Sequence, residues 1–293
     1  MGNALFRGGN SGSARLRLEV LPEDELKYEE MALAPPETMG IMKEEGSDGG
    51  AFTTPKLPWP MYILDAWYSP EIAPFMVSNP RGFVKLTPTD IELLRSQPAA
   101  EACEALALKL QSQIPSTENN PSQLPYFVRL SMCSTKIGTR AKPAHTGIEV
   151  VQQILDSRRC VDSLACPIDH TIWLFEWKAS CNVIRELRVF IRGKKVVAIA
   201  PYYCAVPLDW LNSSTACAVG ESVLDFFELI KDLMPFEDAV MDVLYTEEKT
   251  VQLIEFNPIV TSGGGLFSWV DDIEILAGRM NGPPVMRIVH ARD

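Results

Sequence analysis

The chain has 293 residues, of which 46% are hydrophobic and 22% charged, an ordinary globular composition that can bury a substantial core. Its formal net charge of −11 opposes non-specific binding to nucleic acid and to anionic membrane surfaces. The seven cysteines include no Cys-x-x-Cys pair and no apolar run approaches the ~20 residues that span a bilayer, so we expect no disulfide framework, no zinc site, no membrane association and a cytoplasmic location.

The first third of the chain combines a polar arm with helical segments. Residues 1–53 are rich in Gly, Ser, Glu and Pro, which predicts a flexible N-terminal arm. Within this arm, residues 14–21 alternate apolar and charged side chains, a pattern that favours a short strand. Residues 87–97 predict a helix that Pro88 opens, and residues 99–114 predict a second helix.

The middle of the chain predicts a helix, a strand and a hairpin. Residues 146–157 carry apolar side chains at helical spacing. His170 follows an aspartate and precedes an apolar run, where we expect a surface turn and not a general base. The apolar run ends in the polar segment Glu176-Trp177-Lys178. Residues 186–200 then predict a hairpin whose first strand carries Glu186 and Arg188 on one face.

An amphipathic helix over residues 221–234 leads to a second hairpin, which is the most informative segment for function. If its turn is centred at residues 248–249, Asp242 lies opposite Glu255, with Cβ atoms roughly 5 Å apart, and Asn257 shares their face. Opposed like charges destabilise a sheet, and a divalent cation would remove the conflict. Oxygen ligands suit Mg²⁺ held with substrate phosphates better than Zn²⁺. The alternative is an acidic edge hairpin whose charges point into water.

The succession of these segments resembles the ATP-grasp fold. The resemblance implies an α+β architecture in which two α/β lobes with antiparallel sheets enclose a nucleotide cleft. That domain would cover residues 54–293, with one lobe at about 54–170 and the other at about 171–293. ATP and Mg²⁺ are the implied cofactors. The implied contacts are adenine with Glu176, Trp177 and Lys178, ribose with Glu186, phosphates with Arg129 and Arg188, and Mg²⁺ with Asp242, Glu255 and Asn257.

Within that fold, four motifs are similar to those of the cell division cycle protein 123 family, assembly factors for translation initiation factor 2. They are YFVRLS (126–131), ELRVFI (186–191), IEFNP (254–258) and GLFSW (265–269). Several segments depart from the family pattern, including residues 134–138 and 269–272. Arg129 stands where the family has lysine, and a glycine run at residues 263–265 replaces an acidic turn. These departures favour a paralogue with a new task.

Two functions follow from the resemblance. The first is a peptide- or amide-bond-forming enzyme on an ATP-grasp-like scaffold, in which Arg129 and Arg188 would act as catalytic cations. It would be either an ATP-dependent ligase or a relative of the fungal arginine-containing cyclodipeptide synthases that uses aminoacyl-tRNA. The alternative is an Mg-ATP-binding assembly chaperone for the γ subunit of translation initiation factor 2. A degenerate nucleotide site in a scaffold protein is a third possibility. The metal assignment predicts that Asp242→Ala abolishes Mg-dependent ATP affinity and leaves the fold intact.

Overall fold

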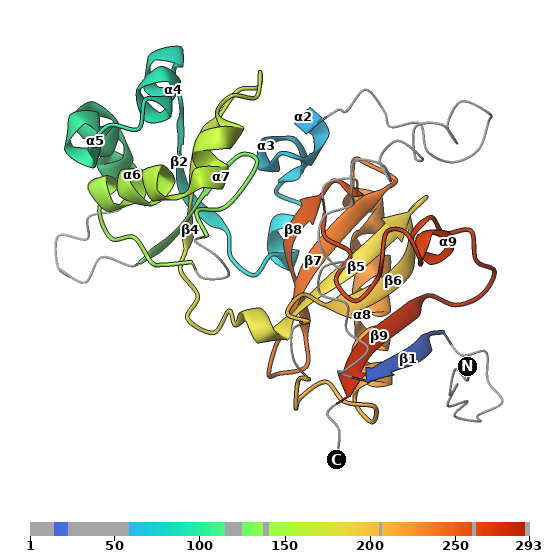
Figure 1. Cartoon of the computed structure of the whole chain (residues 1–293). Coiled ribbons are helices and arrows are strands. Elements are labelled where there is room, and N and C mark those ends of the chain that lie inside the picture. The colour runs from blue at the N-terminus through green and yellow to red at the C-terminus, as the bar shows by residue number, and fades with distance from the viewer. Residues whose placement is uncertain are drawn as a thin grey trace, which may run out of the picture. The chain divides into compact units, whose positions relative to one another are not determined.

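The computed structural model describes residues 15–22, 59–114, 125–136, 141–204, 207–259 and 262–290. The chain divides into two compact units (Figure 1). Unit 1 consists of Met1–Met61 and Cys181–Asp293, and unit 2 of Tyr62–Ser180. The arm predicted at residues 1–53 lies outside the described residues, apart from residues 15–22. In the part of the chain that the structure describes, no helix has the length and apolarity to cross a bilayer.

Unit 1 contains a six-stranded sheet in the order β1-β9-β6-β5-β7-β8. Its strands are β1 (Arg17–Pro22), β5 (Glu186–Arg192), β6 (Lys195–Pro201), β7 (Ala239–Tyr245), β8 (Val251–Asn257) and β9 (Val285–His290). The short strand predicted in the arm is confirmed as β1. Strand β9 runs parallel to both β1 and β6, so the sheet is mixed and not wholly antiparallel. Glu19 of β1 binds Arg287 of β9, Oε2 to Nε at 2.8 Å.

Both hairpins predicted in unit 1 are present, and their turns use left-handed backbone. Gly193 and Lys194 join β5 to β6 with φ of 53° and 54°, as expected for a two-residue turn that matches strand twist. In the second hairpin the N–H of Thr246 donates to the carbonyl of Thr250 at 2.8 Å, and Lys249 has φ of 63°. These tight turns pair β5 with β6 and β7 with β8, and all four strands belong to one sheet (Figure 1).

Helices cover the sheet of unit 1. The described ones are α8 (Ala216–Ile230), η5 (Val183–Arg185), η6 (Lys231–Leu233) and α9 (Ile273–Leu276), while α2 (Trp59–Tyr62) lies at the unit boundary in sequence. Helix α8 begins five residues before its predicted start and packs on β6, β8 and β9. On β5, Phe190 meets Phe267 and Trp269 edge to face, with ring centroids 5.8 and 5.9 Å apart. The face of the sheet on which Phe190 lies also carries the predicted acidic cluster.

Unit 2 contains an antiparallel sheet in the order β2-β4-β3, with β2 (Pro80–Lys85), β3 (Tyr126–Leu130) and β4 (Thr171–Glu176). Its helices are α3 (Leu64–Trp67), η3 (Ala73–Phe75), α4 (Pro88–Arg95), η4 (Ala100–Cys103), α5 (Glu104–Gln113), α6 (Gly147–Asp156) and α7 (Arg158–Ser163). Strand β4, which sequence reasoning places in the C-terminal lobe, is the central strand here. Thr87 and Asp90 cap α4 reciprocally, as its sequence predicts.

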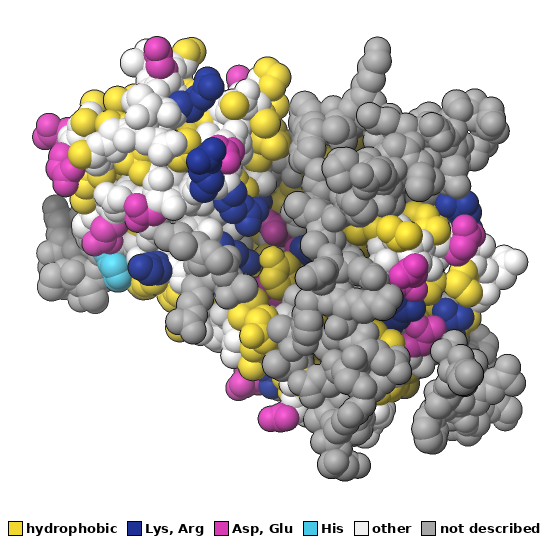
Figure 2. Space-filling view, in the orientation of Figure 1, with side chains coloured by type: hydrophobic (Ala, Val, Ile, Leu, Met, Phe, Trp, Pro, Cys, Tyr) yellow, Lys and Arg dark blue, Asp and Glu magenta, His cyan; other side chains and the backbone are white. Residues whose placement is uncertain are grey.

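Helices α5 and α6 pack closely in the core of unit 2. A Cβ atom on Gly147 would lie 2.0 Å from the carbonyl oxygen of Ala107, so only glycine permits this approach. Helix α7 has no counterpart among the predicted elements. Figure 2 shows Lys and Arg side chains gathered over α7 on the viewed face. Within α7, Arg158 binds Asp162 at 2.8 Å.

Candidate functional site

The central feature of unit 1 is a buried ion pair between adjacent strands. Arg188 of β5 lies opposite Asp242 of β7 in the sheet register. The guanidinium donates two hydrogen bonds of 2.9 Å, from Nε to Oδ1 and from Nη2 to Oδ2. The side chain of Arg188 is 13% exposed and that of Asp242 is 2% exposed. This two-point geometry is the strong form of a carboxylate–arginine contact.

The predicted register of the second hairpin is confirmed, because Asp242 pairs with Glu255. A bulge between Asp242 and Val243 makes this pairing possible, since the turn alone pairs Tyr245 with Val251 and thus sets the register one residue out. Asn257 donates from Nδ2 to Oδ2 of Asp242 at 3.1 Å. The three residues proposed as metal ligands are therefore neighbours on β7 and β8.

Arg188 makes two further contacts that sequence reasoning did not identify. Its Nη1 donates to the carbonyl oxygen of Gly263 at 3.0 Å, within the glycine run. Its Cζ atom lies 4.7 Å from the centroid of the Tyr202 ring, a cation–π contact. Tyr202 in turn donates its backbone N–H to the carbonyl of Glu186 at 2.8 Å, and Glu186 is a buried carboxylate two residues from Arg188. The cluster thus fixes the guanidinium from several sides.

The electrostatics of the cluster favour the charged state of Arg188. Burial disfavours the charged form of Arg188, but the charge and hydrogen bonds of Asp242 outweigh it and raise the pKa of Arg188. The residues Glu186, Arg188, Asp242 and Glu255 together carry a formal charge of −2, from three carboxylates and one guanidinium. Such a surplus of negative charge suits a divalent cation.

The oxygen atoms of the cluster are of the kind that binds Mg²⁺. A carboxylate offers about four lone-pair sites. On Asp242, Arg188 occupies two of these and Asn257 a third. Glu255 is partly exposed and contributes a second carboxylate. Oxygen donors of this kind fit Mg²⁺. Among the described residues, no group of three or more His, Cys, Asp or Glu side chains forms a metal cluster, so Mg²⁺ would keep ligands from water or phosphate.

The other four predicted residues belong to unit 2. Arg129 is 4% exposed on β3, pairs in register with Trp173 and donates from Nε to the carbonyl of Leu130 at 3.5 Å. Glu176 ends β4 and accepts from Lys178 at 2.6 Å and from Arg81 at 2.7 Å. These hydrogen bonds, that from Arg81 first, lower the pKa of Glu176.

The backbone of the predicted adenine segment is already hydrogen-bonded within unit 2. The carbonyl oxygen of Glu176 accepts from Oγ of Ser78 at 2.8 Å. The N–H of Trp177 donates to the carbonyl of Pro125 at 2.8 Å. A base that lies against this segment would therefore rely on stacking or on other groups.

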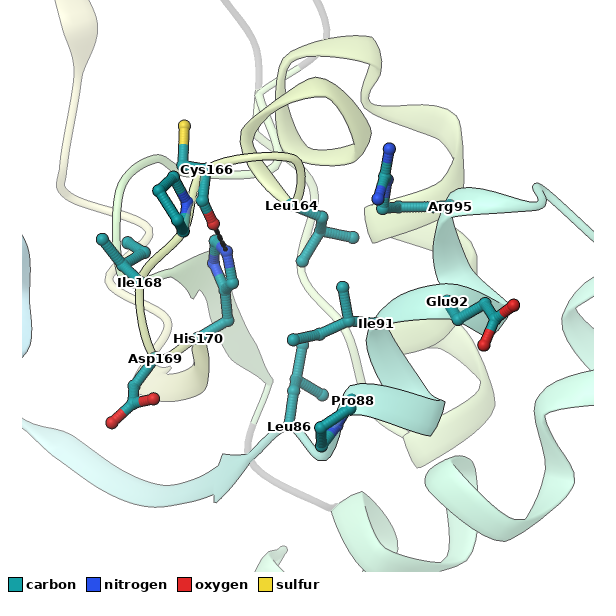
Figure 3. A pocket seen from close by; sticks show the side chains of 11 residues that line it. Leu86, Pro88, Ile91, Glu92, Arg95, Leu164, Cys166, Ile168, Asp169 and His170 are labelled. Carbon is teal, nitrogen blue, oxygen red and sulfur yellow. Dashed lines mark hydrogen bonds between the residues drawn. The ribbon is translucent and has the colours of Figure 1, made fainter.

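Unit 2 also contains a hollow of about 620 Å³ between α4 and the segment before β4 (Figure 3). None of the predicted site residues lines it. His170 does, and it is 1% exposed, so the expected surface turn was wrong: the apolar side chains of Leu86 and Ile168 help to enclose this residue. Its Nε2 contacts the carbonyl of Cys166 at 3.2 Å, and burial lowers the pKa of His170.

Part of the chain is similar to a known protein family. Residues 151–293 match the family model D123. Over these residues the chain is similar to the D123 family. The matched segment contains the strands β5, β7 and β8 that carry the acidic cluster. No curated protein matches the chain.

Two solved structures of Cdc123 from Schizosaccharomyces pombe share the fold. One has a TM-score of 0.58 and the C-terminally truncated form 0.61, each with 18% identity over 78% of this chain and 96% of that chain. A RimK domain ATP-grasp protein from Sphaerobacter thermophilus DSM 20745 aligns with a TM-score of 0.38 and 11% identity, over 92% of this chain and 81% of that one. The predicted fold of mixed helices and strands is confirmed, and this chain shares the fold of Cdc123.

Proposed function

We propose that this chain is an Mg-ATP-binding assembly factor for the γ subunit of translation initiation factor 2. The observation that carries the nucleotide part is the Arg188–Asp242–Asn257 cluster with Glu255 on the neighbouring strand. The resemblance of the chain's motifs to the cell division cycle protein 123 family carries the choice of partner. The fold shared with Cdc123 supports the same choice.

In this proposal each residue of the cluster has a distinct role. Arg188 supplies a fixed positive charge for phosphate oxygens, and Asp242 keeps that charge in place by its two hydrogen bonds. Glu255, Asp242 and Asn257 would hold Mg²⁺, which when bound neutralises phosphate charge. Arg129 in unit 2 is a second proposed phosphate cation, and Glu186 the ribose carboxylate.

The nucleotide part is tested by calorimetry with ATP in the presence and absence of Mg²⁺. Glu255→Gln keeps the shape of the side chain and removes one charge from the edge strand β8. We expect Mg-dependent ATP affinity to fall at least tenfold in this variant. Glu247→Gln is the matched control, since Glu247 lies in the exposed turn of the same hairpin. Equal affinity in both variants and the parent protein refutes the metal assignment.

The partner part is tested by binding of the purified full chain to the purified γ subunit. We expect a stoichiometric complex whose affinity depends on Mg-ATP. If calorimetry detects Mg-ATP binding but no complex forms, the assembly role is wrong and the nucleotide site stands.

The sequence also predicts a peptide- or amide-bond-forming enzyme, and this stays a prediction. No contact among the described residues favours the enzyme over the assembly factor. Incubation with amino acids, aminoacyl-tRNA and ATP, followed by mass spectrometry, separates the two. A new amide product that Arg188→Lys abolishes would establish the enzyme. The absence of any product together with complex formation supports the assembly factor.

A further inference from the structure

Two buried thiols of unit 2 lie against one another. Cys133 follows β3 and Cys160 lies within α7. Their Sγ atoms are 3.6 Å apart, although the residues are 27 positions apart in the chain. Cys133 is 5% exposed and Cys160 0%. The fold itself therefore places two reduced sulfur atoms in contact.

The surroundings of the pair make the two thiols unequal. The Cys160 thiol hydrogen-bonds to Cys133 and lowers the pKa of Cys133, in spite of burial, and the positive charge of Arg159 acts in the same direction. The same hydrogen bond, together with burial, raises the pKa of Cys160. The Cys133 thiol also donates to Oγ of Ser163 at 3.7 Å. Cys133 thus has the character of a nucleophile and Cys160 that of a retained thiol.

We propose that Cys133 and Cys160 are a reversible redox modification site that closes to a disulfide, with hydrogen peroxide as the oxidant. The Cys133 thiolate attacks one peroxide oxygen, the O–O bond breaks, and hydroxide leaves, which gives a sulfenic acid on Cys133. The Cys160 sulfur then attacks the Cys133 sulfur, the S–O bond breaks, and water leaves. In total, two thiols and one peroxide give one disulfide and two waters. Burial of both sulfur atoms favours a small neutral oxidant over a bulky disulfide reagent.

Formation of the bond would fix the turn that follows β3. In the reduced form the N–H of Leu130 donates to the carbonyl of Cys133 at 2.7 Å, and Ser134 forms a β-bridge with Arg129. The sulfur atoms must approach to about 2.0 Å. The bond would tie this turn to α7 and so restrain the strand that carries Arg129.

The test uses the reduced full chain, treated with hydrogen peroxide and digested without reductant. We expect a crosslinked peptide that joins Cys133 to Cys160, two hydrogens lighter than the sum of its parts, and its loss after dithiothreitol. Cys103→Ser is the matched control, because Cys103 is another buried thiol of unit 2, and it should retain the crosslink. If peroxide oxidises the exposed Cys181 and Cys217 while Cys133 and Cys160 remain unlinked, the proposal is overturned.

A second measurement tests the separate roles of the two sulfur atoms. In Cys160→Ser the resolving thiol is missing, so a sulfenic acid should persist on Cys133 and react with dimedone. In Cys133→Ser we expect no dimedone adduct on Cys160. An adduct on Cys160 alone would reverse the assigned roles. The mapping of the parent protein needs no substitution, so poor folding of a variant leaves the central test intact.

Discussion

The structure allows a direct estimate of how much unfolding free energy is lost when the Asp242 carboxylate is removed. Asp242→Asn keeps the size of the side chain but removes the charge that holds Arg188. Because the guanidinium is 13% exposed, solvent replaces little of that interaction. Removing one partner of a buried ion pair costs about 3–5 kcal/mol. At about 2–4 °C per kcal/mol, the midpoint of thermal unfolding should fall by about 6–20 °C.

This expectation differs from the one drawn from sequence alone, in which Asp242→Ala leaves the fold intact. Unfolding followed by circular dichroism, with Asp225→Asn as control, distinguishes them. Asp225 pairs with Arg15 on the surface of unit 1, where both side chains are largely exposed, so its loss should leave the midpoint unchanged. The double variant Arg188→Met with Asp242→Asn should recover part of the lost stability, because no buried charge is left unpaired. A single Asp242→Asn variant as stable as the control refutes the reasoning.

Three further predictions concern stability. Gly147→Ala places a methyl group 2.0 Å from the Ala107 carbonyl, and we expect destabilisation by about 1–3 kcal/mol in urea unfolding. Lys249→Gly should raise the unfolding free energy by up to about 1 kcal/mol, because the residue has φ of 63°. For His170, burial lowers the folded-state pKa below the unfolded value of about 6.5, so the folded state binds fewer protons. The stability that neutral His170 contributes is present above about pH 6.5 and is lost as the pH falls toward the folded-state pKa. Between pH 7 and 5, the His170→Gln variant should therefore lose less stability than the parent protein. Equal pH dependence in the two proteins contradicts this assignment.

The local elements of the site could be predicted from sequence because turns and alternation are local signals. The strand pairs on either side of residues 193–194 and 247–249 follow from turn residues and β-favouring runs. The pairing of Asp242 with Glu255 also followed, although the bulge beside Asp242 that permits it has no recognisable sequence signal.

The non-local parts could not be predicted. Arg188 meets Asp242 because β5 and β7 are neighbours in the sheet, which depends on the path of α8 and not on either hairpin. Strand β9 was missed altogether, and its parallel pairing with β1 joins the two ends of the chain. His170 is 1% exposed and lines a hollow together with residues of α4, which its immediate neighbours in sequence do not reveal.

The ion pair changes the argument for a functional metal site. Opposed carboxylates with no cationic partner have no structural use in a sheet, and their presence would then favour a bound metal ion over a degenerate site. Arg188 gives Asp242 a structural use, since it binds that carboxylate at both oxygens. Asp242 therefore no longer distinguishes an active metal site from a structural ion pair. Glu255 does distinguish the two, because it lies partly exposed on the edge strand β8. Its replacement by glutamine leaves both partners of the Arg188–Asp242 pair in place.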